Sequence, residues 1–325
     1  MLPTVKLAER KIQMGGTHEF LEDPRNEDVL IYINGEFFAR HEAKVSVFDS
    51  AFLVGDGLWE SFRLHNGKLA FVGQHLQRLK ANLKALDYDL GMPVEALVDE
   101  IYKTVRANKM HTNVHIRMMI TRGTKKSPSQ DPRANVGGPT IVIITEYKTP
   151  SRQAQEGIRL FTVHVRRGRP DVQDPKLHPH SKLNCVISCI QAIKAGVDEA
   201  LMLDPQGFVS TCNSTNFFIV VNNQVWTSTG QYCLNGITRG NIIELCHQNR
   251  IEVFEKNFSL IDVYAADEAF VTGTFGGLAY VSEVDGRLIG NGRMGPVSSR
   301  LKDLYAALLE QECPFEGLGN SALLC

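Results

Sequence analysis

Two Asn-Gly dipeptides constrain the first half of this chain more than any other feature. Asn34-Gly35 lies within the apolar stretch 29–38, and Asn66-Gly67 interrupts a similar stretch at 60–72. An Asn-Gly pair between apolar runs favours a tight hairpin, because both residues tolerate the positive φ of a type I′ turn. We therefore expect antiparallel hairpins here.

The elements that follow extend this sheet and add two helices. Residues 74–86 place leucines on one helical face, and residues 94–107 repeat that amphipathic period. Two strands are expected at 114–123 and 139–147, separated by a polar loop at 124–138 that is rich in Pro and Gly. The first half is thus predicted to be an antiparallel sheet with two helices.

A loss of apolar periodicity at residues 148–157 predicts an interdomain linker. It follows a small N-terminal domain (28–147), which is preceded by a polar arm (1–27). The larger C-terminal domain (158–325) mixes short strands with helices, without the regular rhythm of a doubly wound fold. The expected class is α+β.

Charge and motifs exclude several functions. Lys plus Arg (35) balances Asp plus Glu (36), so no overall field points to nucleic acid or an anionic membrane. No apolar run approaches a membrane span, and the polar N-terminus lacks a signal peptide, so the cytoplasm is expected. Seven cysteines without a C-x-x-C pair argue against a disulfide framework or a metal site. The dinucleotide, P-loop and nucleophile-elbow motifs are missing from the sequence.

Four segments, in order, carry a family resemblance. They are FLVGDGLWESFRLHNGKLAFVGQHLQRLKANL (52–83), HPHSKLNCVIS (178–188), LDPQGFVSTCNSTNFFIVVNN (203–223) and CLNGITRGNI (233–242), backed by EAFVTGTFGGLAYVSEVDG (268–286). Each motif is weak alone, but the ordered set resembles the fold-type IV pyridoxal-phosphate enzymes over residues 29 to about 300. That group contains branched-chain aminotransferases, D-amino acid aminotransferases, (R)-amine transaminases and aminodeoxychorismate lyases.

The resemblance implies a fold, a cofactor and an activity. The fold is a small N-terminal α/β sandwich domain with a larger C-terminal pseudo-barrel α/β domain. The cofactor is pyridoxal 5′-phosphate, and the activity moves an amino group between an amino acid or amine and a 2-oxo acid or ketone. A homodimer is also implied. The alternatives are a lyase on the same scaffold and a cofactor-binding protein that has lost catalysis.

Lys182 is the predicted catalytic residue. A lone lysine is usually a solvated surface charge. In the family pattern, however, a lysine that opens this helix holds the cofactor as a Schiff base, and its freed amine then acts as the base.

The cofactor phosphate needs donors, and the resemblance supplies them from three segments. Gly236, Ile237 and Thr238 precede a helix whose free N–H groups and positive end favour an anion, although such a sequence alone is more often just a helix cap. Thr274 matches a second phosphate hydroxyl, and Arg78 matches the arginine that pairs with the phosphate.

The substrate side is expected to be formed by strand residues. Trp59 matches an aromatic residue facing the cofactor, and alternation places Arg63 on the same side. His115 and Arg117 match the carboxylate-binding pattern of branched-chain aminotransferases, whereas Arg122 matches that of D-amino acid aminotransferases. Residues five apart point to opposite sides of a regular strand, so we expect only one of these arginines to meet the substrate and the other to be a surface or dimer-interface charge. We favour Arg117 as the substrate residue.

One position departs from the pattern. Most relatives have Glu where this chain has Thr211, in a stretch whose Asn matches Asn216. That carboxylate keeps the pyridine nitrogen of the cofactor protonated. A threonine hydroxyl is neutral, so we expect it to donate to an unprotonated nitrogen or to bind through water, and the electron sink should be weaker.

Overall fold

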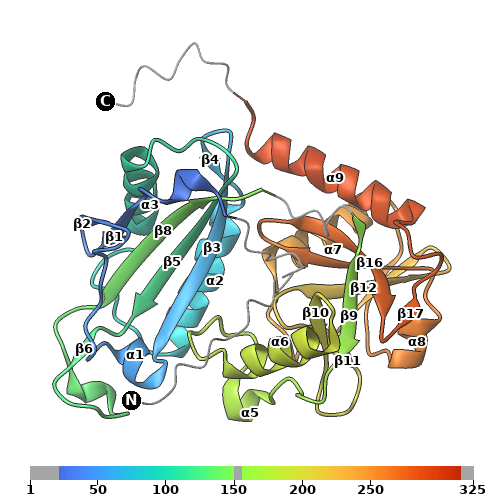
Figure 1. The fold of residues 1–325 in the computed structure, drawn as a ribbon, viewed down its shortest axis with the longest axis horizontal. Helices are drawn as coiled ribbons and strands as arrows, with labels where there is room; N and C mark the ends of the chain where they lie inside the picture. Colours follow the sequence, from blue (N-terminus) through green and yellow to red (C-terminus); the bar gives the residue numbers. More distant parts are fainter. Residues whose placement is uncertain (1–21, 150–155, 316–325) are drawn as a thin grey trace, which may run out of the picture.

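The computed structural model describes residues 22–149 and 156–315, which fold around two large sheets lying side by side (Figure 1). Residues 1–21 of the predicted arm and 150–155 of the predicted linker lie outside this part of the chain. The mixed helix and sheet content confirms the α+β class.

The first sheet is six-stranded, with the order β2-β1-β8-β5-β3-β4, and all its pairings are antiparallel. Positive φ values at Asn34 and Gly35 (48° and 97°) and at Asn66 and Gly67 (50° and 77°) confirm both predicted hairpin turns. The strands are β1 (Leu30–Ile33), β2 (Glu36–Ala39), β3 (Gly57–His65), β4 (Lys68–Leu69), β5 (Val114–Thr121) and β8 (Thr140–Tyr147).

Helices α2 (Val72–Ala85) and α3 (Ala96–Ala107) cover one face of this sheet. Their leucines pack with Leu58, Phe62 and Leu64 of β3 in one buried core. The opposite face, which carries the odd-numbered residues of β3, is therefore available for a site.

Two details differ from the prediction. The 124–138 stretch, expected to be a loop, contains a small ribbon of β6 (Thr124–Lys125) and β7 (Asn135–Val136), with the 3-10 turn η2 (Pro132–Ala134) between them. The helix α1 (Ser50–Val54) was not expected, because five residues are too few for a readable period. A further 3-10 turn, η1 (Pro24–Asn26), precedes β1.

The second sheet is nine-stranded and mixed, with the order β11-β10-β9-β16-β15-β12-β13-β14 and β17 paired to β16. Strand β9 is parallel to both β10 and β16, and β13 is parallel to β14. The strands are β9 (Ile158–Thr162), β10 (Glu199–Leu203), β11 (Val209–Cys212), β12 (Asn216–Val221), β13 (Gln224–Thr227), β14 (Val253–Glu255), β15 (Glu268–Gly273), β16 (Gly277–Val284) and β17 (Arg287–Leu288).

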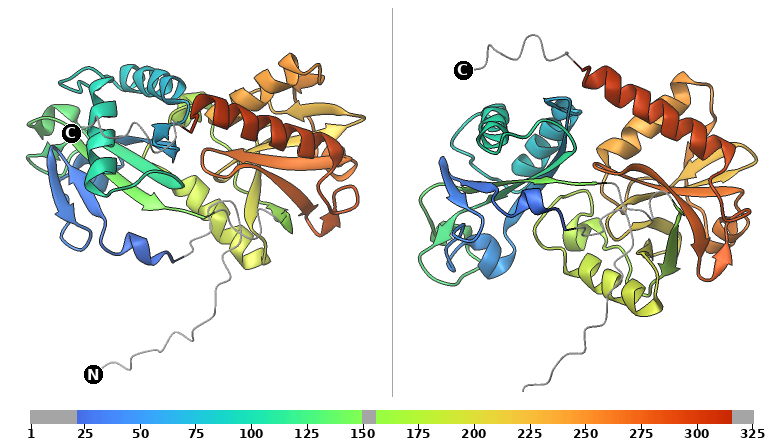
Figure 2. Two further views of the ribbon diagram at one scale, coloured as in Figure 1. Left: turned by 90° about the horizontal axis from the view of Figure 1, so that it is seen from above. Right: turned by 45° about the horizontal axis from the view of Figure 1, so that its top comes forward.

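Successive residues of the central strands point to opposite faces of this sheet, and a separate hydrophobic core lies on each face. Phe218 and Phe270 stack face to face, 4.8 Å apart, on the side of α7 (Ile237–Gln248) and α9 (Pro296–Glu312). Phe217 and Val271 pack on the other side, near α8 (Leu260–Tyr264). Helix α6 (Leu183–Ala195) packs against β9 and β10, and α5 (Pro170–Gln173) precedes it in the chain (Figure 2).

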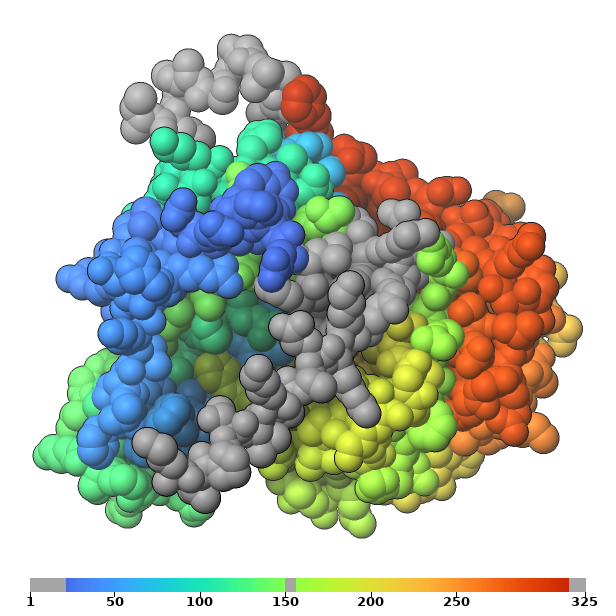
Figure 3. Space-filling model, viewed as in Figure 1, coloured from blue at the N-terminus to red at the C-terminus, as the bar shows by residue number. Residues whose placement is uncertain are grey.

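A hollow lies between the two sheets, bordered by the N-terminal half and by α6 (Figure 3). At one end, α9 reaches back to the first sheet, where Asn66 donates to Glu310 at 3.2 Å. Among the described residues, none of the helices has the length and apolar content needed to cross a membrane.

Candidate active site

Lys182 lies where the two sheets meet, at the residue that precedes α6. The segment before it pairs with the start of β3 as an antiparallel bridge. The Trp59 amide donates to the His178 carbonyl at 3.0 Å, and the His180 amide donates to the Gly57 carbonyl at 2.8 Å. The backbone of the first sheet therefore fixes the segment that carries the lysine.

Gly55 brings the end of α1 against the same segment. Its φ of 72° is left-handed, and a Cβ there would overlap the Ser181 hydroxyl, which donates to the Gly55 carbonyl at 3.1 Å. A larger residue would therefore be strained and would push the lysine segment away.

The environment of Lys182 favours a neutral amine. Burial lowers its pKa to about 8, from an ordinary value of 10.5. The Cys185 thiol opposes this shift, whereas the guanidinium groups of Arg167, Arg78 and Arg117 add to it. A lysine with such a pKa has a reactive neutral fraction near neutral pH.

The Trp59 indole lies close to both this amine and Arg117. Its Nε1 donates to the Pro179 carbonyl at 3.1 Å, which fixes the ring. The Arg117 guanidinium carbon lies 4.1 Å from the ring centroid, and the Lys182 Nζ lies 6.0 Å from it. The His178 ring packs against the indole with centroids 3.6 Å apart.

The register of β3 and β5 brings the predicted substrate residues onto one face. Ser61 pairs with Arg117, and Arg63 pairs with His115, so these side chains alternate to the same side as Trp59. Arg63 donates from Nη1 to the Phe275 carbonyl at 3.1 Å. It thereby ties this face to the loop after β15 that carries Thr274.

Arg117 carries a charge that no carboxylate balances within the described residues. It forms a cation–π contact with Trp59 but no ion pair. Burial lowers the pKa of Arg117, with Glu146 opposing the shift. The half-buried guanidinium donates no hydrogen bond within the described residues, so it can bind an anion.

Arg122 is engaged elsewhere and does not share this face. Its Nε donates to Asp56 at 2.8 Å, and its two Nη atoms donate to the carbonyls of Leu86 and Asp87 at 2.8 and 2.9 Å. Its guanidinium also stacks on Tyr88. Each of the three Arg122 nitrogens thus already donates to the protein, on the side of the strand away from Arg117, which favours a scaffold role over the predicted contact with substrate.

The start of α7 carries Gly236, Ile237 and Thr238, the residues predicted to hold the phosphate and called the cradle here. Helix α7 begins at Ile237, with Gly236 as its N-cap and no side chain capping it, so its first N–H groups are free for a ligand. Asn216 donates to the Leu234 carbonyl at 2.9 Å and would collide with a Cβ on Gly236. Thr238 is buried one residue into the helix, with its Oγ1 3.4 Å from the Tyr305 hydroxyl.

Arg78 lies beside this cradle but is already paired. Its Nη1 donates to the Asn235 carbonyl at 3.1 Å. Its Nε and Nη2 donate to the buried Glu60 at 2.8 and 2.7 Å, and His75 lies 2.9 Å from the same carboxylate. Burial opposes ionisation of Glu60, but Arg78 and the neighbouring histidines hold its pKa well below the usual range.

The hydroxyl of Thr211 is already committed within the protein. It donates to the Thr215 carbonyl at 2.7 Å, and Thr215 in turn donates to the buried Glu199 at 2.7 Å. The Thr211 oxygen is thus left as an acceptor, and donation to a ring nitrogen would first require the hydroxyl to rotate.

Several orphaned polar atoms fit a polar cofactor in the hollow. Buried atoms without a hydrogen-bond partner in the described residues include the Ser61 and Thr272 hydroxyls, Arg63 Nε and His180 Nε2, whereas His178 Nδ1 lies 3.7 Å from the Glu60 carboxylate. Thr272 pairs with Asn216 across β12 and β15, so it lies near the cradle, whereas the predicted Thr274 is only half-buried in the loop beyond. In the described part of the chain, no group of His, Cys, Asp and Glu is arranged to hold a metal.

Sequence reasoning missed Glu60, Arg167 and His178. Glu60 lies among Leu58 and Phe62 on the apolar face of β3, and a carboxylate on a core face signals a buried ion pair. Arg167 donates to the Cys185 sulfur at 3.2 Å and lines a cavity of about 280 Å³ next to Lys182. Arg167 stands among other basic residues in the sequence, and this pattern gives no indication that Arg167 is buried.

A family model and individual related sequences both indicate the same kind of protein. Residues 57–284 match the family described as Amino-transferase class IV. Branched-chain-amino-acid aminotransferase-like protein 2 of Arabidopsis thaliana is 39% identical over 88% of this chain and 51% of its own length. The branched-chain-amino-acid aminotransferase of Pseudomonas aeruginosa is 31% identical over 87% of this chain and 94% of its own.

Solved structures agree with these sequence matches. The crystal structure of the T.th. branched-chain amino acid aminotransferase with pyridoxamine 5′-phosphate superposes with a TM-score of 0.81 and 29% identity, covering 89% of this chain and 97% of that one. The chain spans about half the length of the Arabidopsis relatives that it matches. By the family match and by the identity over most of its length, this chain belongs to the class IV aminotransferases.

Proposed function

We propose that this chain transfers an amino group between a branched-chain amino acid and a 2-oxo acid, with pyridoxal 5′-phosphate bound covalently to Lys182. The observation that carries the proposal is the lysine itself. Its half-buried side chain lies at the head of α6, with Nζ 6.0 Å from the Trp59 ring, and partial burial lowers its pKa to about 8. The relatives named as branched-chain aminotransferases support the substrate class.

The cofactor, when bound, supplies an electron-withdrawing ring that stabilises charge developing at the substrate's α-carbon. A solved branched-chain aminotransferase structure complexed with N-(5′-phosphopyridoxyl)-L-glutamate supports the choice of cofactor. Here the N–H groups at Gly236 and Ile237, the hydroxyls of Thr238 and Thr274, and Arg78 would hold its phosphate.

The remaining roles follow from the geometry. Lys182 would take the substrate's α-proton and return it, because its neutral form is accessible near pH 8. Arg117, a half-buried cation beside Trp59 that forms no ion pair in the described residues, would bind the substrate carboxylate. Asn216 would hold the cradle loop in place, and Thr211 would face the ring without adding negative charge.

We also propose that the chain works as a homodimer. The outward face of α6 exposes Leu183, Val186, Ile187, Ile190 and Ile193 at helical spacing. The Ser181–Gly55 hydrogen bond brings this face next to α1, where Phe52 is 71% exposed. An apolar face of this extent favours burial against a second copy.

The described cysteines are free thiols, which supports a reducing compartment such as the cytoplasm.

Borohydride reduction followed by peptide mass spectrometry tests the covalent site. We expect one cofactor adduct, on Lys182, and its loss in Lys182→Arg. Lys194, exposed in the last turn of the same helix, provides the matched control, since Lys194→Arg should keep the adduct. An adduct on another lysine would refute the assignment.

A further inference from the structure

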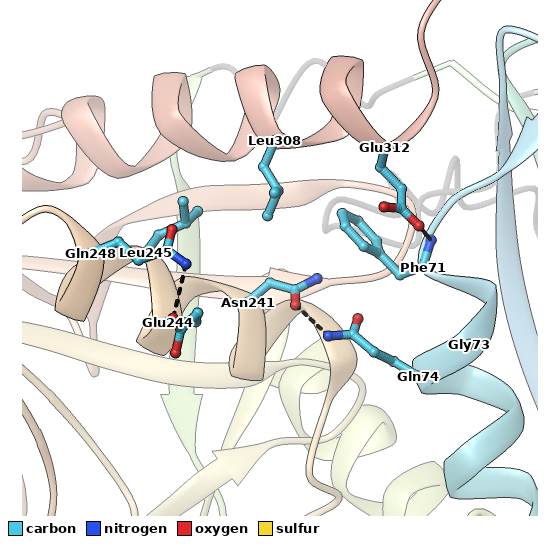
Figure 4. A pocket seen from close by; sticks show the side chains of 9 residues that line it. All are labelled: Phe71, Gly73, Gln74, Asn241, Glu244, Leu245, Gln248, Leu308 and Glu312. Atoms are coloured by element: carbon cyan, nitrogen blue, oxygen red, sulfur yellow. Dashed lines mark hydrogen bonds between the residues drawn. The ribbon is translucent and has the colours of Figure 1, made fainter.

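A cavity of about 350 Å³ lies between the start of α2, the middle of α7 and the end of α9 (Figure 4). No residue of the Lys182 segment or of the Trp59 face lines it. A hydrogen bond of 2.8 Å from Gln74 to the Asn241 oxygen joins α2 to α7 at its edge. The cavity is therefore separate from the candidate active site but shares two of its helices.

Hydrogen-bond donors in this cavity lack an acceptor. Asn241 is 6% exposed, and its Nδ2 has no partner among the described residues. In Figure 4 this nitrogen points into the space between Phe71 and Leu308. No side chain caps the start of α2, where Gly73 lines the cavity with its backbone. These donors, at a positive helix end, favour a carboxylate.

Acidic groups stand at the rim of the same cavity. Glu244 and Glu312 line it, and neither forms an ion pair within the described part of the chain. Glu244 accepts only from Gln248, and Glu312 only from the Phe71 amide. Two carboxylates without a counter-charge favour a cation beside them.

The walls between these polar groups are apolar. Phe71, Leu245 and Leu308 face the space (Figure 4). Phe71 itself adopts a left-handed φ of 53°, an uncommon conformation for an aromatic residue, and this conformation holds it at the mouth of the cavity. The site thus combines carboxylate-binding donors, ammonium-binding acids and an apolar wall.

We propose that this cavity binds a free α-amino acid with an apolar side chain, as a site distinct from the active site. Its carboxylate accepts from Asn241 Nδ2 and from the first N–H groups of α2. Its ammonium donates to the acids at the rim, and its side chain packs on Leu245 and Leu308.

The regulatory consequence rests on the proposed function. Helix α7 begins at the phosphate cradle, and α2 carries Arg78. A ligand that bridges α2 and α7 holds these two groups together, so the amino acid and the cofactor strengthen each other's binding. By linkage the effect is reciprocal.

Calorimetric titration of borohydride-reduced holoenzyme with L-leucine tests the site. In the reduced protein the cofactor is fixed to its lysine, so leucine cannot displace it. We expect one binding event, weakened at least about tenfold by Asn241→Leu and by the double variant Glu244→Gln/Glu312→Gln. Arg117→Gln is the matched control and should leave the affinity unchanged.

Three outcomes would overturn the proposal: no binding at millimolar leucine, equal affinity in the cavity variants, or loss of binding in Arg117→Gln. The last would place the leucine in the active site. If borohydride fixes no cofactor, the proposed function fails, and the same variants titrated in the protein as purified still decide whether the cavity binds leucine.

Discussion

The pKa of Lys182 should govern how fast the apoprotein captures its cofactor, because only the neutral amine attacks an aldehyde. With a pKa of about 8, about 9% of the amine is neutral at pH 7 and about 91% at pH 9. An unperturbed lysine at 10.5 would rise from about 0.03% to about 3% over the same range. Between pH 7 and pH 9 the capture rate should therefore rise about tenfold and begin to level off. With an unperturbed lysine it would rise about a hundredfold without a plateau.

Stopped-flow absorbance of apoprotein mixed with pyridoxal 5′-phosphate measures this rate. Scanning only above pH 7 keeps the cofactor phosphate about 90% or more doubly ionised, since its second pKa is about 6. Arg167→Met removes one of the charges that lower the pKa of Lys182. In this variant the pH at which the capture rate levels off should therefore be higher. A rate that still rises in proportion to hydroxide at pH 9 in the native protein would refute the reasoning.

Three further predictions concern the groups around the lysine. Arg78→Ala should weaken cofactor affinity about ten- to a hundredfold, as expected for a lost contact to a charged group; unchanged affinity by equilibrium dialysis would remove Arg78 from the cradle. Arg117→Ala should slow turnover of amino acid donors far more than that of simple amines, which carry no carboxylate. Arg122→Ala, the matched control, should instead lower the melting temperature and affect both donors alike, and a selective loss there would contradict the scaffold role. Ile187→Lys on α6 should shift the protein from dimer to monomer in sedimentation velocity, and a native monomer would contradict the proposed interface.

Local chemistry made the first sheet predictable. Asn34-Gly35 and Asn66-Gly67 determine their turns through neighbouring residues alone, and both hairpins form. Helix α1 was missed because contacts far along the chain, such as the one between Gly55 and Ser181, hold it in place. Sequence periodicity contains no such information.

The same distinction applies to the site. Alternation along β3 placed Trp59 and Arg63 together, and the pairing with β5 added Arg117 to that face. Alternation could not reveal what satisfies Arg122, because its acceptors lie at Asp56 and at the adjacent Leu86 and Asp87, two segments far from Arg122 in the sequence. Nor could it show that Glu60 already holds Arg78, since that pair forms only when α2 packs on the sheet.

The bridge between β3 and the lysine segment also has a consequence for hydrogen exchange. The amides of Trp59 and His180 belong to different halves of the chain, yet each donates to a carbonyl of the other half. Neither amide proton can exchange with solvent deuterium unless the hydrogen bonds between the two halves break. Their protection factors should therefore be similar and should rise together when the cofactor binds, so these two protons report how often the segment that carries the reactive amine separates from the first sheet.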